Sequence, residues 1–270
     1  MDNIFDLQEF SENKVLINYL GTKNCEIYYY KDLISEISKV TKLIKAEIKV
    51  KNQAQTIGIG FFQKNPTTVA IVLGILNASH SFCFEDSCEV IEGSSSYKLQ
   101  YFFNDQEIEN AANKNLELKA TSEIFGKKVH LYKITTCTAK YHGCYEFCYN
   151  IKTSGSTGKE KYVRVPWQSI LPNITSLQNT FKLQENVIYS SAPVTFDVFI
   201  VDLFLTVRTG SAMLMLDENL RFSKDSLEIL FSDHDAHKGT TFLQTTPSLF
   251  QQWGLENIKN KILDKSSSLK

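Results

Sequence analysis

The sequence predicts an α/β fold, with a mostly parallel sheet and helices on both faces. Three observations support this class. Helical and strand-like patterns alternate along most of the chain, the strand-like runs are short and apolar, and the helical segments are long enough to connect parallel strands. A chain of 270 residues has room for one or two domains, and we favour one large α/β unit over residues 1–270.

The first part of the chain has the pattern helix, strand, helix, strand. Over residues 30–48, apolar residues recur every three or four positions between lysines and glutamates, which predicts a half-buried helix. Residues 57–62 have the pattern of a short buried strand. Pro66 stands where a helix can begin, and this helix is followed by a second short apolar run at Ser81–Phe84.

The middle of the chain is less regular. Residues 86–127 show no sustained period of either kind, and their polar clusters predict an irregular insertion. Strand-like runs return at 129–134 and 145–153. Beyond them the patterns alternate again, with helices at 168–181, 196–207, 224–231 and after Pro247, and strands at 211–216 and 240–244.

The composition excludes several classes of function. The chain has 43% hydrophobic and 22% charged residues and a net charge of -1, so no basic excess indicates binding to nucleic acid or to an acidic membrane. The acidic N-terminus lacks the apolar core of a secretory leader, and no later run is long enough to span a bilayer. We therefore expect a cytoplasmic protein. Its six cysteines are too sparse for a disulfide scaffold and should mostly be buried thiols.

Residues 153–161, TSGSTGKEK, combine two glycines, four hydroxyl residues and two lysines directly after a predicted strand. Glycines let the backbone approach an anion, hydroxyls supply further donors, and a lysine adds a mobile positive charge, so the segment suits phosphate binding. It is not the P-loop of the NTPases, because two residues rather than four separate Gly155 from Gly158. A flexible polar turn is the alternative.

The same segment resembles the signature T-S-G-[ST]-T-G-x-P-K of the adenylate-forming, or AMP-binding, superfamily. This superfamily includes acyl-CoA synthetases, luciferases and the adenylation domains of nonribosomal peptide synthetases. Eight of the nine positions fit, and Glu160 stands where the family usually has proline. Four further segments resemble the β-alanine-activating branch: YVRVP at 162–166, LPNI at 171–174, APVTFD at 192–197 and FLQTTPSL at 242–249. The family's A-Y-V-P-[IL]-D-P stretch is replaced by SFCFEDS at 81–87.

The resemblance implies a partial N-terminal large domain of the adenylate-forming fold. It further implies that ATP, with Mg²⁺, activates a small carboxylic or amino acid as an acyl-adenylate, which passes to a phosphopantetheine thiol such as that of a carrier domain. The protein's part is to position groups and to offset negative charge. By position, the residues implied to bind the ATP phosphates are Thr153, Ser154, Gly155, Ser156, Thr157, Gly158 and Lys161.

The family's later motifs, for adenine, for the ribose hydroxyls and for the lysine of the mobile C-terminal domain, are not recognisable after Pro247. We therefore expect a truncated chain without a complete catalytic set. The alternative is a noncatalytic, shortened paralogue that binds nucleotide or a partner protein.

The resemblance also implies an amino acid as the substrate. Phe196 and Asp197 resemble an F-D motif whose aspartate, in the amino-acid-activating branch, pairs with the ammonium of the substrate. Fatty-acid-activating relatives do not need a carboxylate there, so β-alanine is a fitting acid. The alternative explanation is structural, because aspartate is a favoured N-cap at the start of a helix.

Three other signals have structural explanations. One is a group of soft metal ligands, His142, Cys144 and Cys148. It lacks a fourth ligand at metal-site spacing, so we expect packing and no metal site. His234 and His237 suit a solvated turn better than an acid/base pair. Trp167 replaces a histidine that is common in the family, and it fits either the core of an amphipathic helix or the wall of an acyl site.

Overall fold

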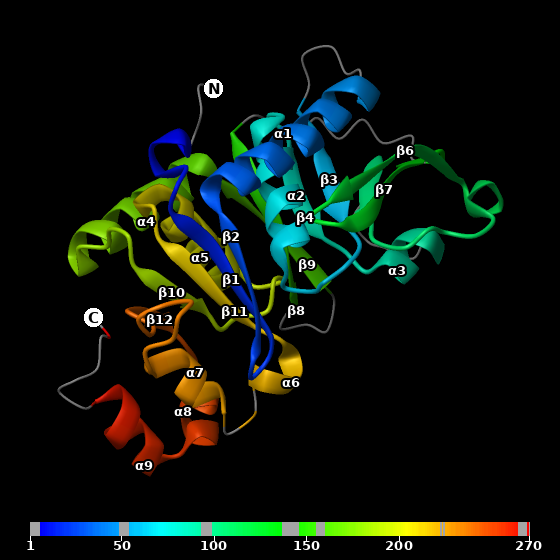
Figure 1. The fold of residues 1–270 in the computed structure, drawn as a ribbon. Helices are drawn as coiled ribbons and strands as arrows, with labels where there is room; N and C mark the ends of the chain where they lie inside the picture. Colours follow the sequence, from blue (N-terminus) through cyan, green and yellow to red (C-terminus); the bar gives the residue numbers. More distant parts are fainter. Residues whose placement is uncertain are drawn as a thin grey trace. The chain divides into compact units, whose positions relative to one another are not determined.

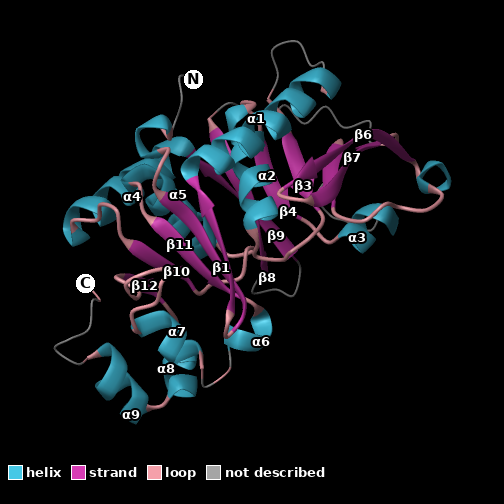
Figure 2. Ribbon diagram, in the orientation of Figure 1, coloured by secondary structure: helices cyan, strands magenta, loops and turns pink. Residues whose placement is uncertain are grey.

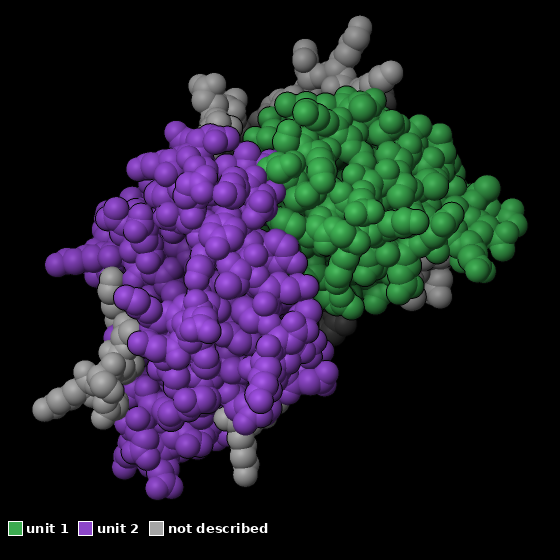
Figure 3. Space-filling view, in the orientation of Figure 1, with its two compact units in different colours: residues 1–4, 35–172 green, residues 5–34, 173–270 purple. Residues whose placement is uncertain are grey.

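The computed structural model describes residues 6–48, 54–92, 99–136, 146–154, 160–221, 223, 225–263 and 269 (Figures 1 and 2). Contacts within the chain divide it into two compact units, which Figure 3 colours separately. Unit 1 is Met1–Ile4 and Ser35–Pro172, and unit 2 is Phe5–Ile34 and Asn173–Lys270. Each unit has its own sheet, so the expected single large α/β unit is built from two compact parts. Sequence patterns show strands but not which strands pair.

The described residues of unit 1 form a seven-stranded sheet in the order β6-β7-β5-β3-β4-β8-β9. The strands are β3 (Thr56–Ile59), β4 (Ser81–Phe84), β5 (Tyr101–Asn104), β6 (Leu116–Ile124), β7 (Lys127–Ile134), β8 (Phe147–Ser154) and β9 (Glu160–Pro166). The pairs β3–β4, β3–β5 and β4–β8 are parallel, and the outer pairs are antiparallel. Its helices are α2 (Pro66–Asn77), α3 (Ser87–Glu92) and the short 3-10 helix η2 (Ala111–Lys114).

In unit 2 the described residues form a five-stranded sheet in the order β12-β10-β11-β1-β2. The strands are β1 (Lys14–Gly21), β2 (Asn24–Tyr29), β10 (Val187–Ser190), β11 (Ala212–Leu216) and β12 (Phe242–Gln244). β1 and β2 are antiparallel, and the other pairs are parallel. The helices are η1 (Gln8–Phe10), α5 (Asp197–Thr209), α6 (Glu218–Arg221), α7 (Ser226–Phe231), α8 (Pro247–Trp253), α9 (Leu255–Asn257) and the π-helix η3 (Ile258–Ile262).

Two long helices, α1 (Tyr30–Glu47) and α4 (Trp167–Phe181), contain the points at which the chain passes from one unit to the other. The predicted α/β class is confirmed as mixed sheets flanked by helices. Parallel pairing holds in the interior of each sheet, antiparallel strands close both edges of the unit 1 sheet and the β2 edge of the unit 2 sheet, and β12 ends the unit 2 sheet in parallel pairing. The strands β1, β2, β9 and β10 were not expected from the sequence.

Helix α2 shows how local signals set an element. The side chain of Asn65 caps it by accepting a 3.0 Å hydrogen bond from the Thr68 backbone N–H, and Pro66 opens the first turn. Its residues are buried from Pro66 to Leu76, as expected of a helix that is apolar on all sides. Gly74 lets it approach α1, because a Cβ there would lie 2.5 Å from the Val40 side chain. α2 also packs on β4.

The expectation of an irregular insertion at 86–127 is wrong. The segment contains α3, β5, η2 and β6. β5 has only four residues, all buried, so it is too short to show a period. β6 is the edge strand of its sheet, largely exposed, and a register shift between Leu118 and Ala120 breaks its alternation. Within the described residues no helix is both long and apolar enough to cross a membrane.

Candidate functional site

The hairpin of β8 and β9 carries the two ends of the predicted phosphate loop. The strands are antiparallel, and Thr153 on β8 stands opposite Lys161 on β9. The Thr153 hydroxyl donates a 3.2 Å hydrogen bond to the backbone carbonyl of Lys161, and the Lys161 side chain is exposed. Ser154 ends β8 opposite Glu160. The other predicted loop residues, Gly155, Ser156, Thr157 and Gly158, lie outside the described residues.

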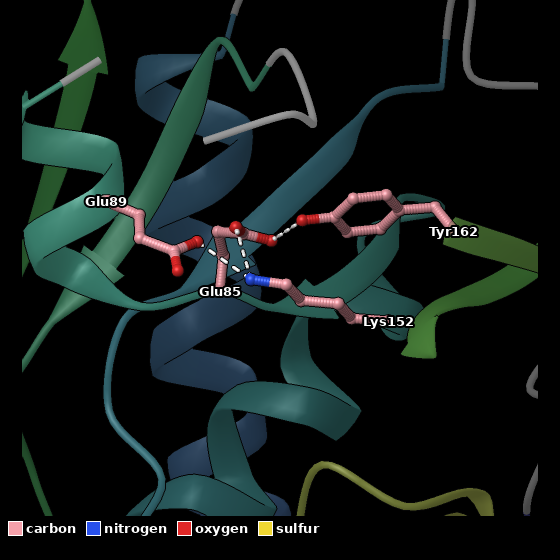
Figure 4. A network of polar contacts seen from close by, with 4 residues as sticks. All are labelled: Glu85, Glu89, Lys152 and Tyr162. Carbon is pink, nitrogen blue, oxygen red and sulfur yellow. Dashed lines mark hydrogen bonds and ion pairs between the residues drawn. The ribbon is translucent and has the colours of Figure 1, made fainter. Parts of the chain in front are cut away.

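A buried carboxylate lies next to this hairpin. Glu85 directly follows β4, where its backbone N–H donates to the carbonyl of Ile59 at 3.1 Å, and its side chain has no exposed surface. Tyr162 on β9 donates its hydroxyl to Glu85 Oε2 at 2.5 Å. The Lys152 ammonium on β8 lies 3.7 Å from Glu85 Oε1 and 2.8 Å from Oε2 of Glu89 on α3 (Figure 4).

The electrostatics of this cluster follow from burial. An ionised carboxylate without solvent is strongly destabilised unless it is paired and hydrogen-bonded, and Tyr162 and Lys152 supply a hydrogen bond and a positive charge to Glu85. The pKa of Glu89 is lowered, chiefly by its hydrogen bond from Lys152. Glu89 is 38% exposed, so water screens its ion pair and its contribution to stability is small.

The pairing of the hairpin separates two sets of side chains. Residues opposite each other in an antiparallel pair share a face, and successive residues point to opposite faces. Lys152 pairs with Tyr162 in register, one position from the Thr153–Lys161 pair. The Glu85 cluster therefore occupies one face of the hairpin, while Thr153 and Lys161 occupy the other.

The donor set on that second face fits a phosphate group. It consists of the exposed Lys161 ammonium and, opposite it at the end of the hairpin, the Thr153 hydroxyl, whose proton is donated to the Lys161 carbonyl in this structure. Among the residues described, no cluster of three or more histidine, cysteine or acidic side chains could hold a metal ion by itself. Mg²⁺ commonly binds through phosphates and water with one or two carboxylates, and this chemistry needs no such cluster.

The second predicted site lies in unit 2, at the start of α5. Phe196 is the N-cap residue, with extended backbone, 58% exposure and no capping side-chain hydrogen bond. Asp197 is the first helical residue and is exposed. The N-cap explanation for Asp197 is therefore wrong by one position, although a carboxylate in the first turn still interacts favourably with the helix dipole. Thr153 and Lys161 belong to unit 1, whereas Phe196 and Asp197 belong to unit 2.

The structure can be compared with the sequence analysis at only some of the other residues singled out there. His142 and Cys144 lie outside the described residues. Cys148 is a buried thiol on β8, as expected, and burial raises its pKa. Trp167 is only 9% exposed at the start of α4, which agrees with a core residue.

The expectation of a solvated turn at His234 and His237 is wrong for His237, which is 6% exposed. Its Nδ1 accepts a 3.0 Å hydrogen bond from the Gly239 backbone N–H, so in the neutral ring Nε2 carries the proton and faces the Tyr19 hydroxyl at 3.4 Å. Burial lowers the pKa of His237 to about 4, and the nearby positive charges of His234 and Lys14 add to the effect.

Sequence reasoning missed the Glu85 cluster. One signal was available, because an acidic residue that directly follows the apolar run of β4 is unusual unless it has partners. Its partners Lys152 and Tyr162 are far away in the sequence, and no local pattern connects them to Glu85.

The chain is similar in sequence to β-alanine-activating enzymes. The Drosophila melanogaster enzyme is 30% identical over 287 residues, which cover 99% of this chain and 27% of that protein. The Mus musculus enzyme is 36% identical over 133 residues, covering 48% of this chain and 12% of that protein. The chain thus spans about a quarter or less of the length of these relatives.

The fold also matches solved structures at low sequence identity. ATP-bound MatB from Rhodopseudomonas palustris superposes with a TM-score of 0.67 at 13% identity, covering 94% of this chain and 48% of that one. The Vibrio cholerae adenylation domain AlmE, in complex with glycyl-adenosine-5'-phosphate, gives a TM-score of 0.58 at 14% identity, covering 92% and 55%. The fold is accordingly that of the N-terminal domain of adenylate-forming enzymes. The chain belongs to the AMP-binding enzyme family, whose model matches residues 105–270.

Proposed function

We propose that this chain is part of an ATP-dependent ligase that activates an amino acid, β-alanine being the best candidate, as an acyl-adenylate. The observation that carries the proposal is the pairing of Thr153 with Lys161 at the end of the β8–β9 hairpin. This pair sets a hydroxyl and an ammonium at the two ends of a segment whose sequence is rich in glycine and hydroxyl residues. Together they are suited to bind the phosphates of Mg·ATP.

In the proposed reaction, the carboxylate of the acid attacks the α-phosphorus and pyrophosphate leaves. Lys161 contributes a point charge on a flexible stem, and the hydroxyl groups of Ser154, Ser156 and Thr157 donate hydrogen bonds to phosphate oxygens. The Thr153 hydroxyl joins them when it leaves the Lys161 carbonyl. Both offset negative charge on the transferring group. A phosphopantetheine thiol, such as that of a carrier domain, then attacks the acyl carbon, and AMP leaves as the thioester forms.

The choice of acid rests on Asp197. Because Asp197 is exposed at the first position of α5 and does not cap the helix, its carboxylate is available to pair with the ammonium of an amino acid. The similarity to β-alanine-activating enzymes supports the same substrate.

The test is binding of Mg·ATP to the purified 270-residue chain by titration calorimetry, followed by β-alanine-dependent exchange of pyrophosphate into ATP. We expect Mg·ATP to bind. Binding of Mg·ATP supports the proposal, and its absence contradicts it. Exchange is not expected from this chain alone, because the family's later motifs are not recognisable after Pro247, so acid-dependent exchange would overturn the expectation of an incomplete catalytic set.

A further inference from the structure

The backbone pairing of β8 with the rest of its sheet ends before the predicted phosphate site. The register pairs between β4 and β8 are Phe82 with Tyr149 and Cys83 with Asn150. Thr153 lies three positions beyond the second of these pairs, and Lys161 is its partner across the hairpin. Beyond Asn150, the hairpin is joined to the end of β4 by the side chain of Glu85.

Glu85 contacts both strands of the hairpin at the same level. Its Oε2 accepts the 2.5 Å hydrogen bond from Tyr162 on β9, and its Oε1 lies 3.7 Å from the Lys152 ammonium on β8. Tyr162 and Lys152 are register partners, so the two contacts hold one pair of residues (Figure 4). Because the carboxyl group is fully buried, displacement of Tyr162 would remove a hydrogen bond that water does not replace.

We propose that Glu85 is a positioning residue that holds the end of the β8–β9 hairpin in place and thereby sets where Thr153 and Lys161 meet the phosphates of ATP. The phosphate part of this inference rests on the proposed function. Glu85 does not touch the nucleotide, because its partners lie on the face of the hairpin opposite to Thr153 and Lys161. Glu85 acts on Thr153 and Lys161 through the backbone of β8 and β9, which also carries its partners Lys152 and Tyr162.

The reason for expecting a measurable effect is geometric. Groups that bind and orient a reacting phosphate lose much of their effect when they are displaced by about 1 Å. Without Glu85, Lys152 on β8 keeps its 2.8 Å ion pair with Glu89, whereas Tyr162 on β9 loses its hydrogen bond to the end of β4. A two-stranded hairpin is only marginally stable by itself.

The experiment compares two tyrosine-to-phenylalanine substitutions in the 270-residue chain. Tyr162→Phe removes the hydrogen bond to Glu85. Tyr28→Phe is the matched control, since Tyr28 donates its hydroxyl to Glu26 at 3.0 Å in unit 2. Glu85→Gln retains a carbonyl acceptor for Tyr162, whereas Glu85→Ala removes it. Each variant is used at a temperature at which circular dichroism shows it to be folded, and Mg·ATP affinity and amide hydrogen exchange are measured.

We expect Tyr162→Phe and Glu85→Ala to weaken Mg·ATP binding about tenfold or more and to accelerate amide exchange in β8 and β9. Glu85→Gln should restore much of the affinity that Glu85→Ala loses, and Tyr28→Phe should leave it within about twofold of wild type. Since all variants are measured in the folded state, a general loss of stability would not rank their Mg·ATP affinities in this order. Wild-type affinity in Tyr162→Phe and Glu85→Ala would overturn the inference.

The two proposals can fail separately. If the wild-type chain does not bind Mg·ATP, the proposed function fails, and the exchange rates alone decide whether Glu85 holds the hairpin. If Mg·ATP binds but exchange in β8 and β9 is the same in wild type, Tyr162→Phe and Glu85→Ala, the role of Glu85 fails and the proposed function stands.

Discussion

Tyr162 donates a 2.5 Å hydrogen bond to Glu85, although the two residues are 77 positions apart in the sequence. The Glu85 side chain has no exposed surface, and the bond joins the end of β4 to β9 in the sheet of unit 1. Removing a hydrogen bond from a buried polar group is costly, because no water molecule replaces the lost partner. This single contact therefore affects both the stability of unit 1 and the placement of the hairpin.

The first prediction concerns stability. Tyr162→Phe should lower the free energy of unfolding by about 1.5–3 kcal/mol, because it removes a hydrogen bond to a buried carboxylate. Urea denaturation of wild type and variant measures the difference. Tyr28→Phe should cost less, since its acceptor Glu26 is partly exposed. Equal losses of stability in the two variants would contradict the argument that the burial of Glu85 makes its hydrogen bond from Tyr162 the more stabilising one.

The second prediction concerns the phosphate site. Lys161→Ala should weaken Mg·ATP binding at least about tenfold, because in the proposed site the ammonium at the hairpin end contacts the phosphates. Lys159→Ala removes the same charge two positions earlier, at a residue expected to face solvent, and should change the affinity much less. Calorimetric titration of both variants at one salt concentration makes the comparison. Similar losses would mean that only the net charge of the segment matters.

The third prediction concerns the amino group of the acid. Propionate is β-alanine without its ammonium, so the ratio of the two affinities tests the proposed contact of the ammonium with Asp197. In the presence of Mg·ATP, the wild-type chain should bind β-alanine at least about tenfold more tightly than propionate, and Asp197→Asn should abolish the preference. Thermal shift titrations with each acid provide the measurement.

Asp197→Asn should leave folding stability within about 1 kcal/mol of wild type, because the carboxylate is exposed and does not cap α5. A variant that kept the full preference for β-alanine would remove the main support for an amino-acid substrate.

The fourth prediction concerns pH. Burial lowers the pKa of both His80 and His237 from 6.5 to about 4. A group with a lowered folded-state pKa binds more protons when unfolded, so its contribution is fully present above pH 6.5 and is lost as the pH falls toward 4. The free energy of unfolding should fall over that range by up to about 3 kcal/mol for each histidine.

Urea denaturation of wild type and His237→Gln at several pH values between about 7.5 and 4.5 tests this dependence, since the two proteins share all other titrating groups. His237→Gln keeps a hydrogen-bonding side chain without a titrating ring, so it should flatten the dependence. An unchanged slope in that variant would show that His237 does not contribute to it.

Local signals were enough for many elements of the fold. The predicted helix at 30–48 is α1, the predicted start at Pro66 is the start of α2, and the apolar run Ser81–Phe84 is β4. These elements are set by periodicity, capping and proline, which act over a few neighbouring residues. The chemistry of the 153–161 segment was likewise evident from its residue types, and its assignment to phosphate binding stays a prediction.

Only the tertiary structure decided which strands pair and which polar residues meet. β5 has no period to detect, because four buried residues between polar segments look alike in a strand and in a loop. His237 appeared to belong to a solvated turn until β1 brought Tyr19 to it. In the sequence, Glu85 is only a departure from the family's A-Y-V-P-[IL]-D-P stretch. The structure shows that Lys152 and Tyr162 contact it. In each case the contacts join residues far apart in the chain, and such contacts depend on the whole sheet rather than on local sequence.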